Sequence, residues 1–278
     1  MLKIDSHQHF WVFDKDRHAW INDDMHACQR NFLPVDLQPL LKQNDIAGCV
    51  TVQVDQTIAE NDFMLKLARE NSFIKGLVGW VDFRSEGIEE SLVQYQGEEL
   101  MKGFRHILQG EADDRHMLNP DFMRGVALLE RYGFTYDILI YPKHLKVATE
   151  FVAAFPQQRF VIDHLAKPFI KSREINEWAK DIQALAEHQN VSCKISGMVT
   201  EADWQSWQPA DFTPYLDVAF NAFGAKRLMY GSDWPVCNVA GGYNEAHDLA
   251  AEYIDQLTQH EQELFWAKNA IEFYRLKV

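Results

Sequence analysis

Stretches typical of buried β-strands alternate with amphipathic helical stretches along the whole of this 278-residue chain. Such alternation predicts β/α units, in which consecutive strands lie parallel in one sheet and helices cover it. Eight strand-like stretches stand out. They span residues 3–9, 48–55, 74–82, 103–108, 135–141, 160–164, 191–196 and 227–233.

Apolar residues recur three and four positions apart between these strands, which predicts helices. One helix has clear signals at both ends, because Asn119 and Pro120 suit its start and Gly133 suits its end. The expected helices span residues 60–71, 120–132, 142–155, 174–189 and 212–223.

Eight β/α units without a linker rich in Gly, Ser or Pro predict an α/β protein, a single (β/α)₈ TIM barrel over residues 1–278. The alternative is a doubly wound open sheet. That fold typically has a glycine-rich phosphate loop after its first strand, where this chain has Ser-His-Gln-His. In a barrel, the residues that act on a ligand lie at the C-terminal ends of the strands, so these ends hold the candidates for function.

Histidines and one aspartate lie at three of these strand ends. His7 and His9 end the first strand and face the same side, because side chains alternate along a strand. His164 ends the sixth strand and Asp233 the eighth. Three imidazoles and a carboxylate match the ligands that zinc accepts. A single histidine in a strand is more often structural, but three histidines and an aspartate at strand ends favour a metal site.

Two basic residues occur within otherwise apolar strands. Lys194 alternates with apolar residues in Val-Ser-Cys-Lys-Ile-Ser, so we expect it to point into the barrel mouth. Arg105 and His106 are neighbours, so only one of them faces inward. A cation at the mouth polarises a carbonyl or holds a carboxylate, and the alternative is a structural ion pair.

Candidate substrate-binding residues follow the second, fifth and eighth strands. Gln53 and Asp55 share one face, Tyr141 ends the fifth strand, and Trp234 follows Asp233. Trp234 is our first candidate for stacking on a ring of the ligand, although a tryptophan is more often a core residue. The other candidates for stacking are Trp11, Trp20 and Trp80.

Two connections are longer than usual, one of roughly 25 residues after His9 and one after the seventh strand. Such loops commonly act as lids or binding loops.

The formal net charge of −14 disfavours nucleic acid and anionic membrane surfaces as partners. No apolar run suits a bilayer span, the first residues do not read as a signal peptide, and four scattered cysteines suit a reducing compartment. We therefore expect a cytoplasmic protein with a small-molecule partner, no nucleic acid and no membrane. The composition is compatible with a homodimer.

Four motifs resemble those of the amidohydrolase superfamily. They are Asp-Ser-His-Gln-His-Phe-Trp at residues 5–11, Asp-His-Leu-Ala-Lys-Pro at 163–168, Cys-Lys-Ile-Ser-Gly at 193–197 and Gly-Ser-Asp-Trp-Pro at 231–235. The chain is similar over nearly its whole length to the branch of sugar-lactone hydrolases that includes fuconolactonase and rhamnonolactonase and is related to the pyrone-dicarboxylate lactonase. This resemblance implies a hydrolase of carbohydrate catabolism that opens a lactone to the aldonic acid.

The resemblance also implies roles for the residues at the strand ends. Asp233 would be the general base, and the three histidines would bind one divalent metal, with zinc as the expected ion, or orient the substrate where no metal is bound. The fifth strand ends in Ile140 and Tyr141, where many members have a histidine, and the fourth strand has Arg105 instead of a lysine that can form a bridging carbamate. We therefore expect no two-metal centre, and a metal that is not strictly required.

The expected chemistry is attack of water on a lactone carbonyl that lies against Arg105, Lys194 or a zinc ion. Asp233 takes a proton from the water, and Asp233 or a histidine such as His164 returns it to the ring oxygen. Two other functions stay open. A metal-dependent decarboxylase of an aromatic acid would use the same barrel but would depend strictly on its metal. A non-catalytic binding protein would leave the cluster at the strand ends unexplained.

Overall fold

The computed structural model describes residues 1–278 and contains one sheet of eight parallel strands that pair in chain order. The strands are β1 (Ile4–Gln8), β2 (Gly48–Val52), β3 (Ile74–Gly79), β4 (Met101–Ile107), β5 (Thr135–Leu139), β6 (Phe160–Ile162), β7 (Val191–Ile195) and β8 (Leu228–Tyr230). This order is that of a (β/α)₈ barrel, so the predicted fold is confirmed and the doubly wound alternative is wrong.

Hydrogen bonds between β1 and the end of β8 close the barrel. The backbone N–H of Asp233 donates to the carbonyl of His7 at 2.8 Å, and the N–H of His9 donates to the carbonyl of Trp234 at 2.7 Å. The hydroxyl of Ser6 donates to the carbonyl of Tyr230 at 2.5 Å. The seam therefore brings the two histidines of β1 beside Asp233, which lies more than two hundred residues away in sequence.

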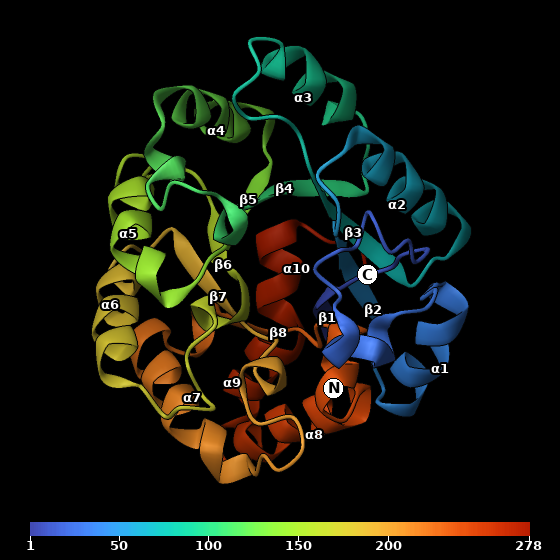
Figure 1. Cartoon of the computed structure of the whole chain (residues 1–278), viewed down its shortest axis with the longest axis vertical. Helices are drawn as coiled ribbons and strands as arrows, with labels where there is room; N and C mark the ends of the chain where they lie inside the picture. The colour runs from blue at the N-terminus through green and yellow to red at the C-terminus, as the bar shows by residue number, and fades with distance from the viewer.

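A ring of helices surrounds the strands (Figure 1). The helices are α1 (Pro34–Gln43), α2 (Ile58–Glu70), α3 (Ile88–Gln96), α4 (Pro120–Tyr132), α5 (Leu145–Ala153), α6 (Asn176–Ala186), α7 (Pro209–Phe223), α8 (Tyr243–Ile254), α9 (Gln259–Glu263) and α10 (Asn269–Tyr274). None of them combines the length and the apolar character that a bilayer-spanning helix needs.

Helix α4 illustrates how local signals set these elements. The Asn119 side chain accepts a hydrogen bond from the N–H of Asp121, Pro120 occupies the first turn, and Gly133 ends the helix with φ +78°. A left-handed residue at this position is normally glycine, because glycine has no Cβ to clash. Phe122 and Val126 are buried on one face. The predicted range of 120–132 is confirmed, whereas the helix predicted at 174–189 is shorter, at Asn176–Ala186.

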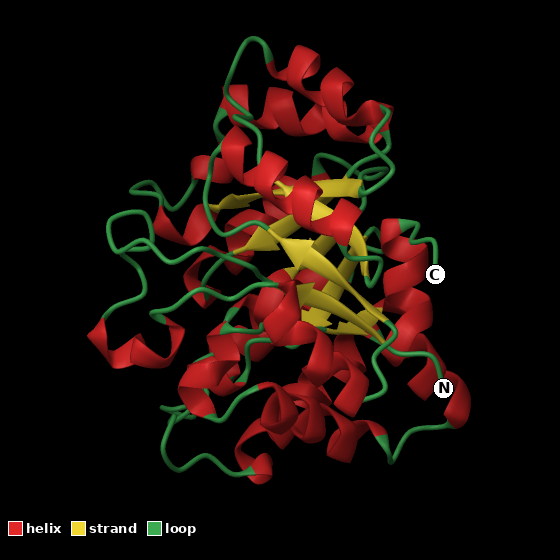
Figure 2. Ribbon diagram, turned by 90° about the vertical axis from the view of Figure 1, so that its right-hand side faces the viewer, coloured by secondary structure: helices red, strands yellow, loops and turns green.

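Helix α10 closes the N-terminal opening of the barrel. Its residues Ala270, Phe273 and Tyr274 belong to a buried apolar cluster with the inward-facing Val50 and Val161. Figure 2 shows both chain termini, with the helix that leads to the C-terminus, on one side of the sheet and many of the loops on the other. The open end is therefore the C-terminal mouth, where the candidate residues were predicted.

All eight strands end earlier than predicted, and at two of them the difference involves a candidate residue. β6 stops at Ile162 and β8 at Tyr230, whereas we expected them to continue to His164 and Asp233. His164 and Asp233 have left-handed backbones, with φ +54° and +57°. A strand cannot continue through this conformation, and the turn changes the direction of the side chain.

Candidate active site

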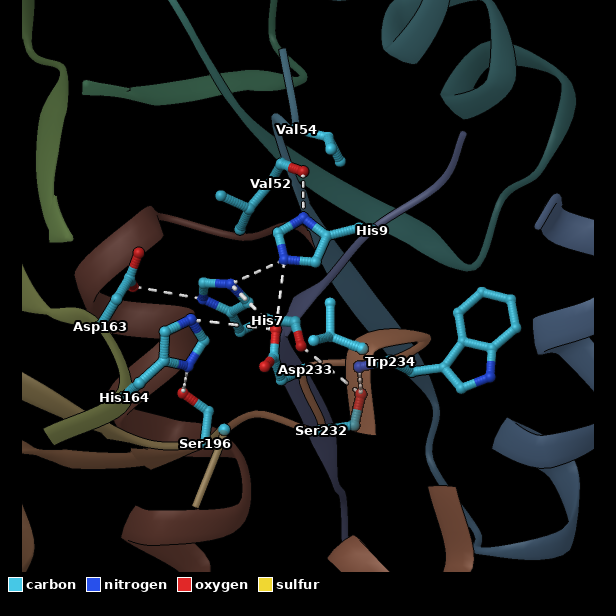
Figure 3. A network of polar contacts seen from close by, with 12 residues as sticks. His7, His9, Val52, Val54, Asp163, His164, Ser196, Ser232, Asp233 and Trp234 are labelled. Atoms are coloured by element: carbon cyan, nitrogen blue, oxygen red, sulfur yellow. Dashed lines mark hydrogen bonds and ion pairs between the residues drawn. The ribbon is translucent and has the colours of Figure 1, made fainter. Parts of the chain in front are cut away.

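Three histidines and one carboxylate meet at the C-terminal mouth of the barrel (Figure 3). His7 Nε2 lies 3.1 Å from His9 Nε2. Asp233 Oδ1 lies 3.3 Å from His9 Nε2, 3.8 Å from His164 Nε2 and 3.9 Å from His7 Nε2. All four residues are buried. The predicted convergence of these strand ends is therefore present in the structure.

The second ring nitrogen of each histidine has a partner outside the cluster. His9 Nδ1 donates to the carbonyl oxygen of Val52 at 2.7 Å, and His164 Nδ1 lies 2.9 Å from the Ser196 hydroxyl. His7 Nδ1 lies 3.2 Å from a carboxylate oxygen of Asp163. His7 Nδ1 also lies 3.1 Å from Lys194 Nζ, which only donates hydrogen bonds. His9 Nδ1 donates to a carbonyl, so the lone pair of this ring, when neutral, is on Nε2 and faces the centre of the cluster.

The donor atoms of His7, His164 and Asp233 all lie within 4.8 Å of one another, close enough to hold one cation. Ligands about 2.1 Å from a tetrahedral zinc ion lie about 3.4 Å from one another, and the separations between Nε2 and Oδ1 atoms given above are 3.1–3.9 Å. Three of the four predicted donors, His7, His164 and Asp233, therefore form a group that fits a divalent metal, and His9 lies beside it.

Burial and charge set the protonation of this cluster. Burial lowers the pKa of His164 to about 4 and holds the pKa of His7 well below its usual value. Burial alone would raise the pKa of Asp233, but His164, His9 and His7 outweigh it and lower this pKa. Near neutral pH His7 and His164 are therefore neutral and Asp233 is ionised, a combination that suits a metal.

A buried network of charges lies beneath the cluster, and it contains Lys194. Lys194 Nζ lies 2.5 Å from Asp137 Oδ2 and 3.0 Å from Asp163 Oδ1. The Tyr274 hydroxyl of α10 donates to the same Asp137 carboxylate at 2.7 Å. Lys194 is fully buried and does not line the cavity, so the prediction that it polarises the substrate carbonyl is corrected. It forms the structural ion pair that was the alternative.

Arg105 is the strand cation that reaches the cavity. Its Nη1 donates to Asp163 Oδ2 at 2.9 Å, and its Nη2 donates to the backbone carbonyl of Gln53. These two contacts hold the guanidinium in place, and Arg105 lines the cavity although only 3% of it is exposed. His106 points the other way and contacts Glu111. The expectation that only one of these neighbours faces inward is confirmed.

A left-handed turn positions His164. Four consecutive residues from His164 to Lys167 have φ between +53° and +57°. This conformation costs roughly 1–2 kcal/mol for each residue that is not glycine. The N–H of Lys167 donates to the carbonyl of His164 at 2.7 Å, and Trp178 Nε1 donates to the carbonyl of Leu165 at 2.8 Å. These bonds offset part of the cost, and such local strain is typical of functional sites.

Because Gly197 has no side chain, it leaves room for the imidazole of His164. It has φ +59°, and a Cβ there would lie 2.5 Å from His164 Nδ1 and 3.1 Å from Asp233 Oδ2. Gly197→Ala is expected to displace the imidazole and to reduce kcat/KM about 100-fold, because misplacement by about 1 Å has effects of this size. Steady-state kinetics would measure it. Gly97→Ala is the control, since nothing lies within 4 Å of the added carbon. Equal activities of the two variants would contradict this role.

A cavity of ≈ 420 Å³ opens above the cluster. His9, His164 and Asp233 line it together with Arg105, and Trp20 and Met25 of the long loop after β1 form part of its wall. The loop after β7 contributes Thr200, Glu201 and Trp204. Both long loops therefore form cavity walls, as predicted for binding loops. The volume suits a small ligand.

The structure corrects most of the predicted substrate-binding residues. Tyr141 lines the cavity, whereas Gln53 is fully buried and its amide donates to the carbonyl of Arg105. Asp55 accepts hydrogen bonds from Arg17 outside the cavity lining. Trp234 is 2% exposed and packs edge-to-face against Phe32 in the core, so it does not stack on a ligand. The side chain after Asp233 points away from the mouth.

Several residues of the site were not predicted. Asp163, beside His164 in sequence, contacts His7, Arg105 and Lys194 from a fully buried position. The aspartate in Val-Ile-Asp-His could have predicted such contacts from the sequence, because a buried charge needs partners. Lys167 and Glu201 line the cavity, but no local pattern marks them for this position.

The chain matches a family of hydrolases over almost its whole length. Residues 4–276 match the model of the amidohydrolase family. The chain therefore belongs to the amidohydrolase family, as its four motifs predicted.

Particular relatives narrow this assignment. The chain is 36% identical over 286 residues to an L-fucono-1,5-lactonase of Burkholderia multivorans (strain ATCC 17616 / 249), an alignment that covers 99% of this chain and 96% of that enzyme. An amidohydrolase from Burkholderia multivorans, crystallised with bound zinc, is similar over 100% of both chains with a TM-score of 0.95 and 36% identity. A probable 2-pyrone-4,6-dicarboxylic acid hydrolase from Acinetobacter baumannii has the same fold, with a TM-score of 0.80, 19% identity and coverage of 99% and 100%.

Proposed function

We propose that this chain hydrolyses a sugar lactone, such as an L-fucono- or L-rhamnonolactone, to the aldonic acid, with Asp233 as the general base. The observation that carries the proposal is the position of Asp233 Oδ1, which faces three imidazoles on the floor of a cavity that Arg105 also lines. The 36% identity to an L-fucono-1,5-lactonase over 99% of the chain supports the choice of substrate class.

Activation of water is assigned to Asp233. The lowered pKa of this carboxyl keeps it ionised near neutral pH, so it can accept a proton from a water molecule above the cluster. The Nε2 atom of His9, at 3.3 Å from Oδ1, and those of the other two histidines, at 3.8 and 3.9 Å, surround this carboxylate oxygen. A lactone is an activated ester, so attack by this water needs only modest help at the carbonyl carbon.

That help is assigned to Arg105. A guanidinium already held by Asp163 and the Gln53 carbonyl presents its positive charge without reorganisation. It stabilises the negative charge that develops on the carbonyl oxygen as the water oxygen bonds to the carbonyl carbon. The bond between the carbonyl carbon and the ring oxygen then breaks. Asp233 returns the proton to the ring oxygen, which gives a hydroxyl group and a carboxylic acid. The acid then loses the second proton of the water to solvent and becomes a carboxylate.

A divalent metal would be held by His7, His9, His164 and Asp233. When bound, it would supply Lewis acidity that stabilises an oxyanion and lowers the pKa of water. The partners of the three imidazoles, Asp163, Val52 and Ser196, would keep their Nε2 atoms directed at it. Only one metal is expected, because Ile140 and Tyr141 provide no further histidine at the end of β5.

The proposal is tested with a panel of sugar γ- and δ-lactones, in which a pH indicator follows acid release. One protein batch is divided into untreated, chelator-treated and zinc-supplemented portions. We expect turnover of at least one sugar lactone. Equal turnover in all portions would assign orienting and proton-handling roles to the histidines, whereas turnover that is lost with chelator and restored by zinc would assign a working metal site.

Absence of turnover on every lactone in all three portions would contradict the proposal. The next reaction to assay would then be metal-dependent decarboxylation of aromatic acids.

A further inference from the structure

Only two charged side chains in the cavity lining have no part in the proposed reaction. They are Lys167, which follows β6, and Glu201, which follows β7. Lys167 Nζ lies 3.3 Å from Glu201 Oε1, and the two side chains are 17% and 21% exposed. The other charged or imidazole groups of the lining are His9, Arg105, His164 and Asp233, all of which the proposed reaction uses.

The backbone holds both members of this pair in place. Lys167 is the last residue of the left-handed turn that also carries His164, and its N–H donates to the His164 carbonyl at 2.7 Å. The Glu201 carbonyl accepts a hydrogen bond from the N–H of Lys171 at 2.9 Å, which links the two segments directly. The position of the ion pair relative to the cluster is therefore set by backbone contacts and does not depend on the ion pair alone.

The chemistry of the pair matches neighbouring hydroxyl groups. A lysine ammonium only donates hydrogen bonds, a carboxylate only accepts them, and a sugar hydroxyl does both. The nearby Thr200 hydroxyl donates to the Gly197 carbonyl at 2.6 Å and lies 3.5 Å from the same Glu201 Oε1. The indole N–H of Trp204 likewise donates to the Thr200 carbonyl at 2.9 Å.

We propose that Lys167 and Glu201 form the subsite that recognises adjacent ring hydroxyls of the lactone, and so determine specificity for a polyhydroxylated substrate. This inference rests on the proposed function and deepens it. A lactone ring without hydroxyls would offer Lys167 and Glu201 no hydrogen-bond partners when it occupies the cavity. Sites built to hydrogen-bond a hydroxyl discriminate strongly against analogues that lack it.

The test compares kcat/KM for a sugar 1,5-lactone with kcat/KM for δ-valerolactone, which has the same ring without hydroxyls. The wild-type protein is expected to prefer the sugar lactone at least about 100-fold, a moderate value for such discrimination because the pair is partly exposed. Lys167→Met and Glu201→Gln should each lower this preference at least about tenfold, mainly through a higher KM for the sugar lactone. Glu201→Gln keeps the size of the side chain, which guards against misfolding.

Lys171→Met provides a matched control. Lys171 pairs with Asp203 at 3.4 Å between the same two segments, but these side chains are 69% and 43% exposed and do not line the cavity. Its substitution should leave the preference unchanged. A structural role of the Lys167–Glu201 pair would instead lower kcat/KM for both lactones by the same factor.

Two results would overturn the inference while the proposed function survives. One is a wild-type protein that hydrolyses both lactones equally well, and the other is a preference that Lys167→Met and Glu201→Gln leave intact. Failure of the wild-type protein to hydrolyse either lactone would overturn the proposed function itself, and this inference with it.

Discussion

Replacement of Asp233 by asparagine is expected to reduce kcat for lactone hydrolysis by about a thousand-fold. General base catalysis alone contributes about 10²–10⁴-fold to a rate. Asparagine keeps the shape of the side chain but removes the negative charge and the basic oxygen that faces His9 at 3.3 Å. Acid release measured over a range of substrate concentrations would give kcat and KM separately.

Binding should survive this substitution. Calorimetry with the unreacted lactone is expected to give a dissociation constant for Asp233→Asn within a few-fold of the wild-type KM, and thermal unfolding should show that the variant is folded. Asp248→Asn is a suitable control, because the Asp248 side chain is 76% exposed on α8. Hydrolysis by Asp233→Asn within a few-fold of the wild-type rate would remove Asp233 as the base.

Replacement of Arg105 by lysine is expected to reduce kcat about 100-fold, with a smaller change in KM. Lysine keeps the positive charge, but a single ammonium cannot contact Asp163 and the Gln53 carbonyl while also facing the substrate, as the fork of Arg105 can. Loss of one well-placed oxyanion donor typically costs about 10²–10³ in kcat. Steady-state kinetics on the best lactone of the panel would measure this effect.

The control for Arg105 is Arg17→Lys. Arg17 also contacts a carboxylate, that of Asp55 at 2.9 Å, but its side chain is 50% exposed and does not line the cavity. This variant should retain wild-type kinetics. An Arg105→Lys variant that also does so would show that stabilisation of the carbonyl oxygen comes from another group.

The sequence alone was sufficient for the fold because its signals are local. The alternation of strand-like and helical hydrophobic patterns predicted all eight strands. The N-cap and the glycine around residues 120–132 predicted both end residues of α4 correctly. The sequence also identified the four donors of the cluster. Strands in a barrel must end at a common mouth, so a polar residue at each strand end was enough to predict that His7, His9, His164 and Asp233 meet.

Only the tertiary structure decided how deep each inward-facing side chain lies. Arg105 and Lys194 both face into the barrel, yet only Arg105 lines the cavity, because Lys194 is held between Asp137 and Asp163 in the interior. Sequence pattern gives the face of a strand but not the depth along the barrel axis, which depends on the stagger of all eight strands.

The backbone conformation of the residues after the strands likewise could not be predicted from the sequence. Left-handed backbones at His164, Lys167 and Asp233 turn these side chains toward the centre or the cavity, although none of the three is a glycine. Contacts from distant segments, such as Trp178 to the Leu165 carbonyl and His7 to the Asp233 N–H, stabilise these turns. The amino-acid sequence by itself determined which residues reach the mouth of the barrel. Long-range packing decided where each of them points, because a strained backbone persists only where surrounding contacts compensate for its cost.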